Sequence, residues 1–154
     1  MRKRKFSLFF CLILIATGCD PITGLVRTVR VKQLPSNESV EAALREVSEI
    51  KKIELHQIPE RRSFSLLEGR IREPAYSSFH YLTRNDGGVL DVKETKNGEK
   101  IIEIRRIGFG STPKDVSERN TALMDKIYAS LRKHSPDLPS QTNMVEKLIR
   151  IRAK

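Results

Sequence analysis

The chain has 154 residues, of which 38% are hydrophobic and 31% charged, a size and composition typical of one globular domain. It contains no tryptophan and few other aromatic residues, so aliphatic side chains must supply most of the core. The formal net charge is +10, but residues 1–18 hold four bases and no acid. Without them, 25 bases face 19 acids, a net charge of +6 that favours anionic neighbours without selecting one.

The first 20 residues contain three zones in a characteristic order. The basic stretch Arg2–Lys5 is followed by an apolar run, Phe6–Ile15, and then by the small residues Ala16–Gly18. This order is typical of a secretory signal peptide. The apolar run has roughly half the length that a bilayer-spanning helix requires. We therefore predict that residues 1–18 are a signal peptide and exclude them from the fold.

The four residues Ala16-Thr17-Gly18-Cys19 resemble the lipobox of bacterial membrane lipoproteins, although Ala16 stands where leucine is most common. The resemblance implies cleavage between Gly18 and Cys19, a diacylglyceryl group on the Cys19 sulfur, and often a further acyl chain such as palmitate on the new terminus. Two or three acyl chains would hold the protein firmly at a membrane. The alternative is ordinary signal cleavage nearby, which would leave Cys19 free.

Asp20 follows the proposed acylation site directly. In lipoproteins of enteric-type bacteria, an aspartate at this place resembles the signal for retention on the inner membrane, facing the periplasm. The rule varies between lineages, so the outer membrane is the alternative destination.

The two cysteines of the chain are Cys11, inside the apolar run, and Cys19. After cleavage the exported domain would hold no other thiol, which excludes an internal disulfide and a zinc site built on cysteine. Export also makes nucleic acid a poor partner despite the basic composition. We expect stability to come from the packed core.

The chain after Cys19 begins with a lipidated N-terminus and short linker, residues 19–24, followed by a β-rich run over Leu25–Gln33. We predict that Arg27, Arg30 and Lys32 in this run either meet anionic lipid near the anchor or protect an edge strand.

The first predicted helix covers Pro35–Ile50 and is capped by Ser36 or Asn37. Its apolar stripe consists of Val40, Ala43, Leu44, Val47 and Ile50.

Alternation and turn residues predict several strands after this helix. They cover residues 51–58, 64–73, 76–83, 89–95 and 100–109. Phe79 and Tyr81 share one face of their strand. Asn97-Gly98 is the strongest hairpin signal, because both residues tolerate a positive φ.

A second helix is predicted over Ser111–His134, with Thr112 as its cap and Pro113 in its first turn. Its apolar side consists of Val116, Leu123, Ile127 and Leu131. The segment 135–140 ends it. The basic C-terminal segment, residues 141–154, fits a short helix, an edge strand or a partner-binding segment equally well.

These elements predict an α+β fold in which an antiparallel sheet of about five to six strands packs against two main helices. We expect residues 25–140 to form the single domain. The strand–helix–strand order over Leu25–Ile58 has a loose similarity to half of a ferredoxin-like fold, which by itself says nothing about function.

No pattern in the sequence predicts a catalytic, metal or cofactor site. His56, His80 and His134 fall on separate elements and lack the spacing of a metal-binding helix. The Gly108–Thr112 turn joins a strand to a helix, where backbone N–H groups can bind an anion, but it lacks both nucleotide-binding fingerprints. We interpret it as a tight turn with its cap.

The sequence therefore predicts a lipid-anchored protein of the bacterial cell envelope that is not an enzyme. We expect it to act on the extracytoplasmic face as a binding or assembly module, with an envelope protein or an anionic polymer as its partner. One alternative is a small periplasmic hydrolase that uses His80 and neighbouring acids. Another is a protective or inhibitory lipoprotein.

Overall fold

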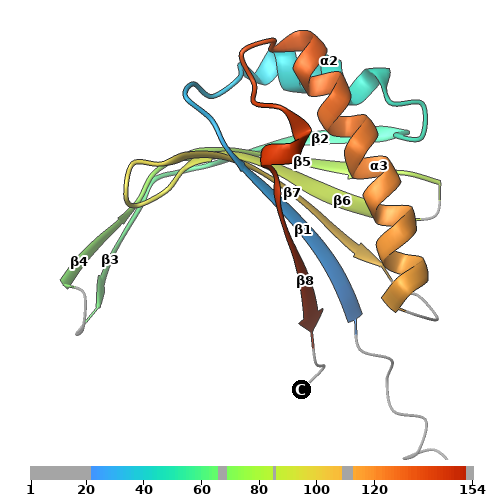
Figure 1. The fold of residues 1–154 in the computed structure, drawn as a ribbon. Helices are drawn as coiled ribbons and strands as arrows, with labels where there is room; N and C mark the ends of the chain where they lie inside the picture. Colours follow the sequence, from blue (N-terminus) through green and yellow to red (C-terminus); the bar gives the residue numbers. More distant parts are fainter. Residues whose placement is uncertain (1–21, 66–68, 85, 109–112, 152–154) are drawn as a thin grey trace, which may run out of the picture.

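The computed structural model describes residues 22–65, 69–84, 86–108 and 113–151 (Figure 1). The elements follow one another as β1 (Ile22–Arg30), α2 (Asn37–Glu46), β2 (Lys52–Ile58), β3 (Arg61–Ser65), β4 (Gly69–Glu73), β5 (Tyr76–Leu82), β6 (Gly87–Glu94), β7 (Lys100–Gly108), α3 (Pro113–His134), the 3-10 helix η1 (Gln141–Asn143) and β8 (Val145–Ile151).

Six of the strands form one antiparallel sheet in the order β2-β5-β6-β7-β1-β8. The sheet arches, and both helices lie on one side of it (Figure 1). The protein therefore has an α+β fold, and the predicted sheet with two main helices is confirmed.

The ferredoxin-like expectation holds only in part. As in that fold, β1 and β2 run in the same direction, are joined by a helix and do not pair with each other. A ferredoxin-like unit has one strand between them, whereas here β5, β6 and β7 lie between them. The meander of three antiparallel strands occupies the place of the single strand.

The core lies between the helices and the sheet. Val40, Ala43 and Leu44 of α2 are fully buried, as their spacing predicts, and Ser36 caps the helix by accepting a hydrogen bond from the Ser39 N–H at 3.2 Å. Leu123, Ile127 and Leu131 of α3 are buried as well. Val116 and Thr112 lie outside the residues whose side chains are described.

A close approach on the helix side requires a glycine. Tyr81, Gly88 and Arg106 are register partners on β5, β6 and β7. The Tyr81 ring lies across Gly88, where a β-carbon would overlap its hydroxyl oxygen. Burial raises the pKa of this phenol, whose oxygen has no hydrogen-bond partner among the described residues.

The tail is an edge strand. β8 pairs with β1 along its whole length, from Ile22 opposite Ile151 to Thr28 opposite Val145. Of the three predicted alternatives for residues 141–154, the edge strand is therefore the correct one, and the sheet extends beyond residue 140. It also places β1 between β7 and β8, so the prediction that its bases protect an edge strand is wrong.

The predicted strand over residues 64–73 is instead a hairpin. β3 and β4 pair only with each other, and residues 66–68 between them lie outside the described part. Pro59 and Pro74 separate the hairpin from β2 and β5. Proline has no N–H to donate to a ladder, which explains why the pairing stops on both strands at the same level.

The two remaining predicted hairpins, β5–β6 and β6–β7, are present. The Gly98 N–H donates to the Thr95 carbonyl at 2.9 Å, and Gly98 has a φ of 79°. Asn97 does not have a positive φ, so only the glycine of this pair uses the conformation on which the prediction rested.

Candidate functional site

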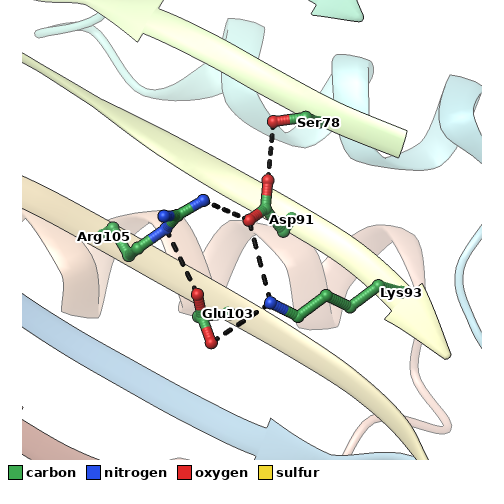
Figure 2. Close-up of polar contacts among 5 residues, drawn as sticks. All are labelled: Ser78, Asp91, Lys93, Glu103 and Arg105. Atoms are coloured by element: carbon green, nitrogen blue, oxygen red, sulfur yellow. Dashed lines mark hydrogen bonds and ion pairs between the residues drawn. The ribbon is translucent and has the colours of Figure 1, made fainter. Parts of the chain in front are cut away.

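One face of the six-stranded sheet has no helix over it in the described part of the chain. We call it the open face; α2 and α3 lie behind the sheet in Figure 2. Because successive residues of a strand point to opposite sides, register partners share a face. One row of partners crosses all six strands here: His56, Ser78, Asp91, Glu103, Thr28 and Val145.

Asp91 lies at the centre of this face, and its side chain is 1% exposed. The Ser78 hydroxyl donates to Asp91 Oδ1 at 2.6 Å, and Arg105 Nη2 donates to Oδ2 (Figure 2). Lys93 Nζ lies 4.0 Å from the same carboxylate. The buried charge is therefore compensated by two bases and a hydroxyl, as a buried carboxylate requires.

Glu103 closes the cluster into a ring. Its two oxygens lie 3.4 Å from Lys93 Nζ and 3.2 Å from Arg105 Nε (Figure 2). Two acids and two bases thus alternate around the ring, and each carboxylate contacts two cations. This arrangement holds Arg105 and Lys93 in fixed positions on the surface.

His56 and His80 lie beside this ring. The centroids of the two imidazole rings are 4.4 Å apart. In the pairing of β2 with β5, Glu54 lies opposite His80, so His56 is a diagonal neighbour of His80 on the same face. Glu54 lies 3.8 Å from His56 Nε2, and its hydrogen bond from Lys52 holds its pKa below the ordinary value. Sequence spacing placed these histidines on separate elements, and only the strand register brings them together.

His134 lies on the other side of the molecule, where its Nε2 is 2.8 Å from Glu46 on α2. This contact and the bond from Ser130 to the Ala43 carbonyl join the two helices. Nowhere in the described residues do three His, Cys, Asp or Glu side chains group as a metal site would require.

A second polar cluster faces the helices. Arg27 is 9% exposed and pairs with Asp125 of α3 and Glu146 of β8, beside Gln141 and a cavity of about 430 Å³. Burial by itself would lower the pKa of this guanidinium, but its hydrogen bonds to the two carboxylates outweigh that effect and raise it. The cluster fixes β1 and β8 to α3.

The prediction that the β1 bases meet lipid is wrong for Arg27, since it is buried and paired within the fold. Arg30 is exposed but lies 3.3 Å from Glu99, at the end of β1 opposite to Ile22. Lys32 is exposed just beyond it.

The other predicted site residues lie outside the described part of the chain. They are Gly18, Cys19 and Asp20 at the proposed anchor, and residues 109–112 of the turn before α3.

No local sequence pattern predicted the Asp91 ring, although the sequence contains a signal for it. Asp91 stands between Leu90 and Val92 in a strand that is otherwise apolar at its centre. Charged residues at alternate positions of neighbouring strands, such as Glu103 and Arg105, complete the pattern. Recognising it requires the register of three strands, which sequence alone does not supply.

None of the described helices is long and apolar enough to cross a membrane. No protein-family model matches the chain, and a search of curated proteins finds no relative. The function therefore has to be inferred from the site itself.

Proposed function

We propose that the chain is an exported, lipid-anchored protein of the bacterial envelope that binds a protein partner through the open face of its sheet. The anchor is the proposed acylation of Cys19, supported by the order of basic, apolar and small residues before it. β1 begins at Ile22, so at most about 10 Å of extended chain separates the sheet from the anchor.

The open face carries the binding part of the proposal. It combines the fixed charges of the Asp91 ring with two exposed apolar side chains, Leu82 at 51% and Val145 at 69%. Protein interfaces combine apolar anchors with paired polar groups in this way. A uniformly anionic polymer would suit a face with bases alone, whereas this one presents Glu103 and Glu54 beside Lys93 and Arg105.

Binding is favoured over catalysis by the state of the charged groups. The carboxylates of Asp91 and Glu103 are each held by two cations, and Glu54 is hydrogen-bonded to Lys52. A general base needs a carboxylate or imidazole whose proton affinity is tuned to the reaction. Charged side chains that are already paired with one another suit the recognition of a partner better than they suit general-base catalysis.

Photo-crosslinking in intact cells tests the binding face. A photo-crosslinking residue replaces Leu82 or Val145 on the open face, and Ala129 on the exposed side of α3 serves as the matched control. We expect a discrete crosslinked protein from positions 82 and 145 and none from position 129. Equal products from all three positions, or none from the open face, would contradict the proposal.

The anchor is tested separately by Cys19→Ser. We expect the variant to leave the membrane fraction, because the acyl chains provide the attachment. If it stays membrane-bound to the same extent as the wild type, the lipid-anchor part of the proposal is wrong.

A further inference from the structure

The β3–β4 hairpin stands apart from the six-stranded sheet. It forms a sheet of its own, and Pro59 and Pro74 interrupt the ladder that would join it to β2 and β5. The strand register places the hairpin at the end of the sheet where β1 ends, opposite to Ile22. Because the sheet arches, the hairpin and the start of β1 both point downward from it in Figure 1, at its two ends. In the sequence, the proposed anchor Cys19 lies three residues before Ile22, where β1 begins.

The hairpin combines an exposed aromatic ring with arginines. Phe64 is 73% exposed, more than any other large apolar side chain in the described residues. Arg62 and Arg72 are register partners, and their side chains are 82% and 70% exposed. Phe64 is two residues from Arg62 on the same strand, so the ring and both guanidinium groups share one face of the hairpin.

One register pair of the hairpin places like charges opposite each other, which is destabilising. Two arginines directly opposite each other on paired strands repel. Glu60 offsets this by accepting hydrogen bonds from Arg62 Nε at 2.8 Å and Arg72 Nε at 2.9 Å, and these bonds lower its pKa. One carboxylate serves two guanidinium groups, so a net positive charge surrounds Phe64.

We propose that this hairpin rests on the lipid surface to which the protein is anchored, with Phe64 at the boundary of the acyl chains and Arg62 and Arg72 at the phosphates of anionic lipids. Aromatic rings prefer that boundary, and arginine pairs with phosphate through its planar fork. The inference rests on the proposed anchor, since the tether keeps the hairpin near the membrane. The open face would then look toward the same surface, so a protein bound there would itself lie at the membrane.

The chain has no tryptophan, so a single one reports on its own surroundings. The acylated protein carrying Phe64→Trp is purified from membranes and reconstituted into vesicles of phosphatidylcholine with or without phosphatidylglycerol. Some vesicles contain lipids brominated near the carboxyl end of the acyl chain, which quench a nearby indole. Ala129→Trp, on the exposed side of α3, is the matched control.

We expect the emission of Trp at position 64 to move to shorter wavelength in vesicles that contain phosphatidylglycerol, and to fall about twofold with brominated lipid, since interfacial side chains enter the headgroup and acyl boundary. Trp at position 129 should do neither. Adding Arg62→Gln and Arg72→Gln together should remove the dependence on phosphatidylglycerol. Unchanged thermal unfolding of the Phe64→Trp protein would show that the probe leaves the fold intact.

The vesicle experiment distinguishes loss of the hairpin contact from loss of the anchor. Acylated protein that floats with the vesicles while position 64 is unquenched would overturn the hairpin contact and leave the anchor in place. A crosslink from position 64 to a protein in cells, without quenching in vesicles, would replace the lipid with a protein partner and equally overturn it.

Discussion

The two faces of the sheet bury their side chains by different means. Toward the helices, Phe79, Leu90 and Ile104 are fully buried in one core with side chains of α2 and α3. On the open face Asp91 is equally inaccessible, but Arg105 and Lys93 of the same sheet cover it (Figure 2). An apolar side chain needs a second layer to leave water, whereas a carboxylate is enclosed by long cationic neighbours that also neutralise it.

Two adjacent residues of β5 give the sharpest test of this contrast. Phe79→Ala removes a fully buried ring, and we expect a loss of about 3 to 5 kcal/mol in the free energy of unfolding. His80→Ala, on the open face, should change it by less than about 0.5 kcal/mol. Urea unfolding of both variants measures the difference. Similar losses would mean that an unrecognised layer covers the open face.

On the helix side, Gly88→Ala should cost about 3 kcal/mol, the upper part of the range for overpacking, because the new methyl group meets both Tyr81 and the Arg105 carbonyl. Tyr81→Phe, by contrast, should be neutral or stabilising, since it removes a buried hydroxyl without a partner. Combining the two should recover part of the loss. The same unfolding assay tests this, and a destabilised Tyr81→Phe protein would contradict the described surroundings of the ring.

On the open face, Asp91→Ala should cost about 2 kcal/mol, because it removes the acceptor of the hydrogen bonds from Arg105 Nη2 and from the Ser78 hydroxyl. The cost is below that of a fully buried pair, since the Arg105 side chain is 42% exposed. Glu94→Ala, at an exposed position of the same strand, is the control. A double-mutant cycle with Arg105→Ala should show coupling, and additive losses would exclude the ring as a source of stability.

The smallest effect concerns an ion pair away from both faces. Hydrogen bonds from Lys126, which has the largest effect, from the backbone of Glu49 itself and from Ser48 together lower the pKa of Glu49 from 4.5 to about 2. This pair therefore stabilises the fold above pH 4.5, and its contribution disappears as the pH falls toward 2. Lys126→Met should lower the Tm slightly at pH 7, and the difference from wild type should close over that range. Lys32→Met, at an exposed position, should show no such trend.

Much of the fold follows from local patterns in the sequence. The stripe of Val40, Ala43 and Leu44 is buried as its helical spacing predicts, and the turn at Gly98 has the expected glycine conformation. The predicted strand across residues 64–73 is wrong, because its two halves belong to different strands that pair with each other, with Ser65 opposite Gly69. Such a hairpin forms through the pairing of its own two strands, and local residue preferences do not reveal that pairing.

The candidate site was less predictable than the fold. Asp91, Glu103 and Arg105 come from two strands, and His56 meets His80 from a third and fourth. Each residue by itself is an ordinary charged or polar position of a half-exposed strand. Only the register converts them into neighbours, and a shift of one residue would move each to the other face.

By itself, the sequence determined the helices, most of the strands and the pattern that motivates an anchor at Cys19, because each depends on residues close together in the chain. The tertiary structure decided that the C-terminal segment is the edge strand β8, that Arg27 is buried, and that Asp91 is enclosed by its neighbours. These outcomes depend on contacts between segments as much as 119 residues apart, such as Arg27 with Glu146. The energy of such contacts exists only once the strands have paired.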